Sequence, residues 1–223
     1  LNLKEKIQTI NPAKKILLVR NGYSNITIGE PKKREIKEQY ILGYVGTISE
    51  WFDNYVIEES LSINNKIRYE LAGPVSNHRQ ILNQRVYYSG VIEYVECKIK
   101  EKRLGDKVTI TGYVHNVREL LLKGSVFIMT SRWEGFPMSI AEALEVGLPI
   151  IAYGIPAMEP LVSNGVEGRI VQPFDNDLLV DAMKELASDK EKRQRMSDAA
   201  VQKAITLTPE SISQYWFRLF DEM

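Results

Sequence analysis

The sequence has little of what several protein classes depend on. It contains one cysteine, Cys97, and two histidines, so an internal disulfide is excluded and a typical zinc or histidine metal site is not expected. Lysine and arginine together number 29, as do aspartate and glutamate, so no net charge favours nucleic acid as a partner. No apolar run reaches the roughly 18 residues of a membrane-spanning helix, and no secretory signal is visible. We therefore expect a cytoplasmic protein.

What is present has the composition of an ordinary globular protein: 223 residues, 44% hydrophobic and 26% charged. Predicted strands alternate with predicted helices almost throughout, which is typical of an α/β fold with a parallel sheet and helices on both faces. One Rossmann-like domain accounts for this pattern. The expected strands are residues 16–19, 40–45, 66–71, 108–111, 126–129, 150–151 and 169–171, and the expected helices are residues 1–10, 85–103, 116–122, 139–147, 175–187, 190–204 and 209–220.

The most informative stretch is residues 131–152, SRWEGFPMSIAEALEVGLPIIA. It follows a buried-strand pattern, and Ser139 is predicted to open a helix whose apolar residues recur at helical spacing. Gly147 is predicted to end that helix, after which a second strand begins. Strand, loop, helix and strand form half of a parallel crossover, and such sheets bind ligands where strand C-termini meet helix N-termini.

Two glutamates lie in this stretch, Glu134 in the loop and Glu142 in the predicted first helical turn. Free backbone N–H groups near residues 138–141 would favour an anion such as phosphate. A carboxylate repels phosphate but accepts hydrogen bonds from paired hydroxyls. A ligand with both phosphate and vicinal hydroxyls would use both kinds of group, and a nucleotide sugar is such a ligand.

Seven residues separate Glu134 from Glu142, and the segment EGFPMSIAEAL resembles the E-x7-E signature of retaining glycosyltransferases of the GT-B fold, especially family GT4. The match extends through residues 147–152, with weaker matches from about residue 19 to 187. The resemblance implies that Glu134 lies by the donor sugar as the catalytic residue and that Glu142 binds the ribose hydroxyls. It implies further donor contacts from the intervening residues, Gly135, Phe136, Pro137, Met138 and Ser139.

Both glutamates also have an ordinary interpretation, which the residues alone leave open. Ser139 and Glu142 have the spacing of a capping box, in which the two side chains satisfy backbone N–H groups at a helix start. Glu134 in isolation has the character of a solvated loop carboxylate.

The source of positive charge for a diphosphate is the main departure from the family pattern. The matching loop of the family commonly carries an arginine and a lysine, whereas here Gly46 and Thr47 follow the strand and no basic residue is near them. We expect both to contact the donor through close backbone approach and a hydroxyl. Arg79, beyond the next strand, is expected to lie on the same sheet edge and to reach the diphosphate, with a plain surface arginine as the alternative.

The resemblance implies the donor-binding half of a glycosyltransferase that moves a sugar from a UDP- or GDP-type donor to a cell-surface glycan, without metal or other cofactor. We expect residues 1–24 to cross over from an N-terminal acceptor domain outside this chain, residues 25–205 to bind the nucleotide sugar, and residues 206–223 to form a C-terminal helix. The chain alone is expected to be inactive, and contact with the inner face of a membrane through the other domain stays open.

Two other functional classes compete with this interpretation. A catalytically inactive nucleotide-binding or assembly module on the same fold would also fit, because the basic pair is absent. A dinucleotide oxidoreductase is disfavoured, because no Gly-x-Gly-x-x-Gly follows the first strand.

Overall fold

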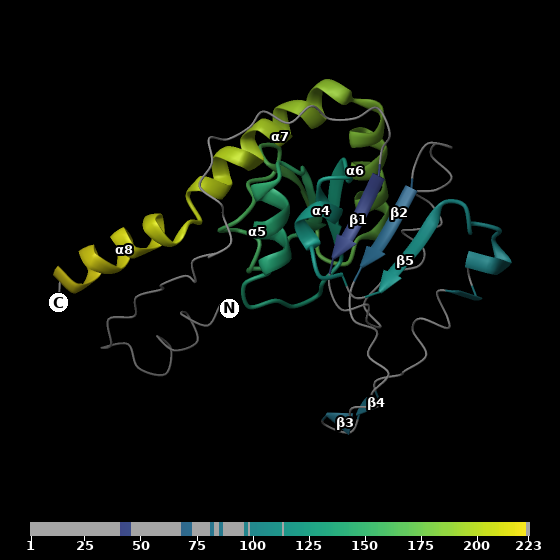
Figure 1. Cartoon of the computed structure of the whole chain (residues 1–223), viewed down its shortest axis with the longest axis horizontal. Helices are drawn as coiled ribbons and strands as arrows, with labels where there is room; N and C mark the ends of the chain where they lie inside the picture. The colour runs from purple at the N-terminus through teal and green to yellow at the C-terminus, as the bar shows by residue number, and fades with distance from the viewer. Residues whose placement is uncertain are drawn as a thin grey trace.

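The computed structural model describes residues 41–45, 68–72, 81–82, 85–86, 96–97, 99–112 and 114–221. Its centre is a six-stranded parallel sheet in the order β5-β2-β1-β6-β7-β8 (Figure 1). The strands are β1 (Ile41–Val45), β2 (Arg68–Ala72), β5 (Val108–Gly112), β6 (Val126–Met129), β7 (Ile150–Tyr153) and β8 (Gly168–Val171). Two short strands, β3 (Ile81–Leu82) and β4 (Arg85–Val86), pair antiparallel as a separate unit.

The strand order reverses between β1 and β6, which pair in parallel with Leu42 opposite Val126. From β1 the chain builds outward through β2 to β5, and from β6 it builds the other way through β7 to β8. This is the doubly wound order, in which the loops after the two central strands diverge and leave a crevice for a ligand. The loop after β6, which carries Glu134, therefore begins at the switch point of the sheet.

The strands on the β6 side form the centre of the core. All four residues of β6 and all four of β7 are buried, although successive side chains point to opposite faces. Both faces of the sheet are therefore covered here, as predicted for a parallel sheet. The edge strand β5 instead alternates between buried or half-buried and exposed positions. The predicted α/β fold class is confirmed.

Five helices complete the described elements: α4 (Val117–Leu121), α5 (Met138–Glu145), α6 (Asn176–Ser188), α7 (Lys190–Ile205) and α8 (Pro209–Asp221). Three of them begin at a capping side chain, from Asn116, Asp175 and Asp189, that accepts a backbone N–H bond of the first turn. Helix α8 extends away from the sheet at the C-terminal end (Figure 1). Within the described residues no helix combines the length and apolar character needed to cross a membrane.

Helix α5 differs from the prediction at its start and agrees at its end. Its N-cap is Pro137, without a capping side chain, so Ser139 is the second helical residue and Glu142 lies beyond the first turn. The predictions that Ser139 opens the helix and that Glu142 lies in its first turn are therefore wrong. The alternative interpretation, a capping box, is excluded as well, because it requires Ser139 at the N-cap. At the other end Gly147 has φ 73°, and Leu148 N donates to Ala143 O at 2.9 Å, which is the Schellman ending that favours glycine.

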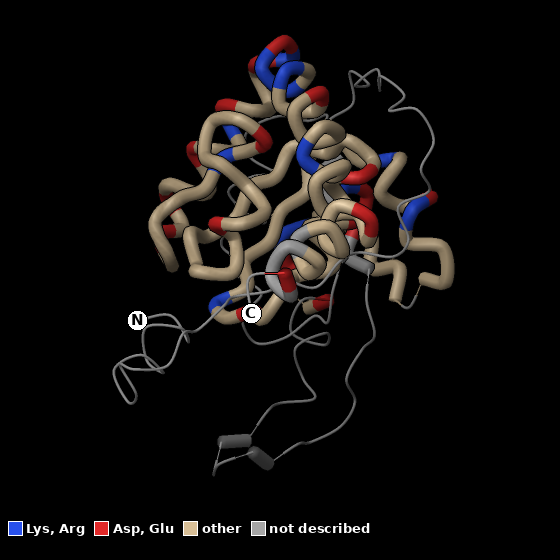
Figure 2. Tube along the Cα trace, turned by 90° about the vertical axis from the view of Figure 1, so that its left-hand side faces the viewer, with Lys and Arg blue, Asp and Glu red and all other residues tan. Residues whose placement is uncertain are grey.

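One expected helix is wrong over part of its length. Residues 85–103 were predicted to be helical, but Arg85 and Val86 form β4, and the described helical residues begin at Glu96. The predicted elements at residues 1–10 and 16–19 lie outside the described residues, and the division into residues 1–24, 25–205 and 206–223 stays a prediction. Basic and acidic positions are interspersed over the described chain, most densely near the top of Figure 2.

Candidate functional site

The loop from β6 to α5 is held at both ends and exposed in between. Thr130 and Ser131 are buried directly after the strand. Pro137 is buried at the start of α5, and Phe136 packs against the core. Between these anchors Trp133 is 75% exposed and Glu134 is half-buried. The structure thus presents Glu134 on a short, anchored span at the switch point of the sheet.

The start of α5 offers fewer backbone donors than the sequence predicts. The N–H groups of Ile140 and Ala141 both donate to the carbonyl of Pro137, at 3.0 and 3.5 Å. Pro137 has no N–H group, so it can offer a ligand its side chain but no backbone donor. In the described chain the amides of Met138 and Ser139 donate to no backbone carbonyl. These two are therefore the backbone donors that the helix N-terminus offers.

Gly135 lies in this loop with empty space around it. A Cβ atom built on Gly135 would meet nothing within 4 Å, and its φ is not in the left-handed region. Neither packing nor backbone strain within the protein therefore requires glycine at this position. Close approach of a ligand is another physical reason for glycine at this position, and both observations are compatible with it.

Glu142 lines a cavity of about 210 Å³ between α5 and the loop that leads into α4. The lining residues are His115, Asn116, Val117, Arg118, Leu121, Glu142 and Glu145. Arg118 Nε lies 3.4 Å from Glu145 Oε1, so the cation in this wall already has a carboxylate partner. Glu142 is therefore placed where it can face a ligand together with groups from a second element.

The cavity residues His115 and Asn116, which lie before α4, and Val117, its first residue, were not predicted as site residues. The signal that could have identified them is their position, because they follow the C-terminal end of β5 by only a few residues. Their contact with the Glu142 cavity depends on α4 lying against α5, which sequence spacing does not reveal.

Three predicted donor residues, Gly46, Thr47 and Arg79, lie outside the described residues. Gly46 directly follows β1 in the sequence, and β1 is the neighbour of β6 in the sheet. Its role and that of Thr47 stay predictions, as does the position of Arg79 on this edge.

A metal-binding cluster does not emerge from the described part of the chain. No group of three or more His, Cys, Asp and Glu side chains is placed there to hold a metal ion. The sequence does contain one Asp-x-Asp spacing, at Asp175 and Asp177, but the Asp175 carboxylate accepts from Leu178 N at 3.0 Å and caps α6. That no metal is needed stays a prediction.

Residues 29–203 match the family model of the glycosyl transferases group 1. The chain is 26% identical over 183 residues to the alpha-D-kanosaminyltransferase of Streptomyces kanamyceticus, covering 77% of this chain and 44% of that protein. It is 26% identical over 132 residues to the poly(glycerol-phosphate) alpha-glucosyltransferase of Bacillus subtilis, covering 59% of this chain and 20% of that protein.

A solved structure with the same fold is that of S. aureus TarM in complex with Fondaparinux, alpha-GlcNAc-glycerol and UDP. Its TM-score is 0.77 at 18% sequence identity, and the match covers 99% of this chain and 43% of that one. The chain thus spans less than half the length of each of these three proteins. Because the family match extends over more than half of the chain and the doubly wound sheet agrees with it, this protein belongs to the glycosyl transferases of group 1.

Proposed function

We propose that this chain is the donor-binding half of a retaining glycosyltransferase of GT4 type. It would hold a nucleotide-diphosphate sugar, of UDP or GDP type, while the sugar passes to a glycan acceptor at the cell surface. The observation that carries the proposal is the position of the two glutamates, with Glu134 on the anchored switch-point loop and Glu142 in the wall of a cavity. The name of the Bacillus subtilis relative supports the class of acceptor.

The cavity beside Glu142 suits one end of such a donor. Its volume of about 210 Å³ is below the roughly 300 Å³ at which pockets for whole drug-sized ligands begin. A ribose with part of its base would fit, and a carboxylate accepts well from vicinal ribose hydroxyls. The rest of the donor would then extend along the start of α5 toward Glu134.

The catalytic contribution of this half would be electrostatic. The amides of Met138 and Ser139, which donate to no backbone carbonyl in the described chain, would donate to the diphosphate, and the α5 N-terminus would add a partial positive charge. These groups would stabilise the charge that develops on the leaving diphosphate as the glycosidic bond loosens. Arg79 would supply the remaining positive charge, and no metal or other cofactor would be required.

The acceptor is proposed to bind to a separate N-terminal domain, which would bring the enzyme to the inner face of a membrane. The isolated 223-residue chain should therefore bind nucleotides and transfer little or no sugar. The alternative is an inactive nucleotide-binding or assembly module, and the absence of basic residues beside Gly46 and Thr47 favours it.

Calorimetric titration of the chain with UDP-, GDP- and ADP-sugars, and with NAD as a control dinucleotide, tests the proposal. We expect one class of nucleotide sugar to bind and NAD not to bind. Absence of binding by every nucleotide sugar, or robust sugar transfer by the isolated chain, would contradict it. Binding followed by transfer once an acceptor domain is supplied would exclude the inactive module.

A further inference from the structure

The turn between β8 and α6 carries a side chain that its backbone disfavours. Asp175 N donates to Gln172 O at 3.2 Å, with Pro173 and Phe174 between them, and Phe174 has φ 68°. These are features of a type II turn, in which proline is common at the second position and the third position favours glycine. A phenylalanine with positive φ is strained, and such strain persists where the surrounding structure holds the residue in place.

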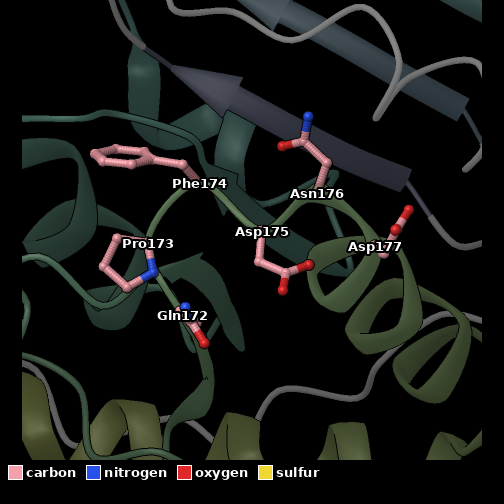
Figure 3. Close-up of a pocket in the computed structure, with 6 residues that line it drawn as sticks. All are labelled: Gln172, Pro173, Phe174, Asp175, Asn176 and Asp177. Carbon is pink, nitrogen blue, oxygen red and sulfur yellow. The ribbon is translucent and has the colours of Figure 1, made fainter.

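The contacts of the Phe174 ring show what holds it. The ring packs edge to face against Tyr153, with centroids 5.9 Å apart and an interplanar angle of 68°. Tyr153 is buried at the end of β7, and its hydroxyl donates to Asn176 Oδ1 at the start of α6. Figure 3 shows the Phe174 ring directed away from the side on which Asp177 lies. The turn is thus tied to the neighbouring strand, and the ring is presented toward the loops that follow β6 and β7.

The second contact of this ring comes from the predicted donor loop. The guanidinium carbon of Arg132 lies 5.1 Å from the Phe174 ring centroid, within the range of a cation–π interaction. Arg132 precedes Glu134 by two residues in the loop after β6. The chain therefore keeps a ring at a position that favours glycine, and that ring meets the arginine beside the predicted catalytic residue.

We propose that Arg132 and Phe174 form a latch that positions Glu134. On one side of Glu134 the loop is fixed by Arg132 on the Phe174 ring, and on the other side by Phe136 packed against the core. Arg132 and Phe174 are positioning residues in this proposal, since they act on the loop and not on the donor. The proposal rests on the proposed function for the role of Glu134, but the contact itself holds the loop whether or not a ligand binds.

The substitution Phe174→Gly separates this role from ordinary packing. Glycine removes the ring but adopts positive φ without strain, so the backbone of the turn is not penalised. We expect a melting temperature near that of the wild type, because relief of the positive φ offsets the lost ring contact with Tyr153. Hydrogen exchange should be about two- to fivefold faster at the amides of residues 131–136, the change expected for losing one exposed cation–π contact. Phe174→Tyr, which keeps a ring, should restore wild-type exchange. Unchanged exchange in the loop of the glycine variant would overturn the latch.

A double-mutant cycle tests whether the two residues act as one unit. Arg132→Gln should accelerate exchange in the same loop, Arg132→Lys should restore most of the protection, and combining Arg132→Gln with Phe174→Gly should add nothing. Additive effects of the two substitutions would overturn the proposal. If Phe174→Gly had a lower melting temperature but wild-type hydrogen exchange in the loop, the ring would contribute only to packing.

Ligand binding by the same variants links the latch to the sugar. Affinity for UDP-glucose should fall about two- to fivefold in Phe174→Gly, by the same loss of one contact, while affinity for UDP should stay at the wild-type value. Equal losses for the two ligands would overturn the assignment to Glu134. The exchange measurement needs no ligand. A wild-type chain that binds no UDP-, GDP- or ADP-sugar would therefore refute the proposed function and leave the latch to be decided by exchange.

Discussion

The parallel strands all begin at one side of the sheet, here called the packed edge, and all end at the opposite side, here called the open edge. Each side contains a residue whose backbone is left-handed. At the edge where β7 begins, the residue is Gly147, with φ 73°. At the edge where β8 ends, the residue is Phe174, with φ 68°. The first position uses the amino acid that the backbone favours, and the second uses one that it disfavours. Gly112, which ends β5 with φ 66°, shows that glycine also occurs where the strands end. The difference therefore indicates that the backbone determines the residue at Gly147, whereas side-chain contacts determine it at Phe174.

The surroundings of the two residues agree with this division. Around Gly147 the structure is closely packed, and the buried Ser197 hydroxyl donates to Gly147 O at 2.6 Å. Around Phe174 the surface is open: Trp133 is 75% exposed and Phe174 is 53% exposed. In a doubly wound sheet the edge with the strand C-termini is the one that binds ligands. Substitutions at the first edge should therefore change stability, and those at the second should change binding.

The largest effect on the packed edge is expected at Gly168, the first residue of β8. A Cβ atom there would lie 2.0 Å from the carbonyl oxygen of Ile150, a backbone atom in the paired strand. Gly168→Ala should destabilise the fold by at least about 3 kcal/mol, because the two strands must move apart. Chemical denaturation measures this change. A loss of unfolding free energy below about 1 kcal/mol would contradict this expectation, because it would show that the two strands can move apart at little cost.

A smaller effect is expected at Gly147. Alanine at this position would have an unfavourable φ, and its Cβ would lie 3.0 Å from Val201 Cγ2 and 3.1 Å from Ser197 Oγ. Gly147→Ala should cost about 1–3 kcal/mol of unfolding free energy. Donor affinity should be unchanged, which titration of the folded variant would check. A selective loss of affinity would break the division between the two edges.

At the open edge Gly135→Ala should give the opposite result. The Cβ atom meets nothing within 4 Å in the protein, so stability should stay within about 0.5 kcal/mol of the wild type. If a ligand approaches the loop closely, affinity should fall about tenfold, or about 1.4 kcal/mol. Denaturation and calorimetry on one preparation give both values. Wild-type affinity would mean that the open space around Gly135 is not occupied by the donor.

The smallest effect is expected for an ion cluster at the packed edge. The hydrogen bond from Lys192 lowers the pKa of the Glu185 carboxyl below its usual 4.5, with Arg169 lowering it further and burial opposing both. Because the folded pKa is lowered, the stabilisation is present above pH 4.5 and is lost as the pH falls through the folded pKa. The carboxyl is about one-third exposed, so solvent screening limits its value to about 1 kcal/mol or less.

The difference in unfolding free energy between the wild type and Glu185→Gln measures this contribution. It should be present at neutral pH and should decline as the pH falls below 4.5. Glu191→Gln is a suitable control, because Glu191 is exposed on α7 and lies 3.9 Å from Arg195, a weak surface pair. A difference that grows toward low pH would contradict the assigned direction of the pKa shift.

The sequence was sufficient for the elements whose signals are local. The β6–α5–β7 unit was predicted because it has two apolar runs and an intervening helical period, and its Gly147 ending was predicted because Gly-x-Pro stops a helix. The start of α5 was not predicted correctly, because Ser-x-x-Glu has the same spacing when the serine is the N-cap as when it is the second helical residue. Only the backbone angle of Pro137 distinguishes these cases.

The parts of the site that the sequence did not predict depend on long-range placement. The cavity wall at His115 exists because α4 lies beside α5. The contact between Arg132 and Phe174 joins residues 42 positions apart and depends on the positive φ of a turn whose residue type suggests nothing unusual. Pattern and spacing contain no information on either contact, whereas the parallel sheet follows from the alternation of strands and helices.

The central claim, that Glu142 holds the donor through hydroxyl groups, is tested most directly by calorimetric titration of Glu142→Gln with the nucleoside diphosphate that the wild type binds best. Glutamine keeps the size of the side chain and removes its charge. The account predicts a loss of about 1–3 kcal/mol in binding free energy, the value of a hydrogen bond to a charged group, in a variant that remains folded, with wild-type affinity in the control Glu191→Gln. Wild-type affinity in Glu142→Gln would contradict the account.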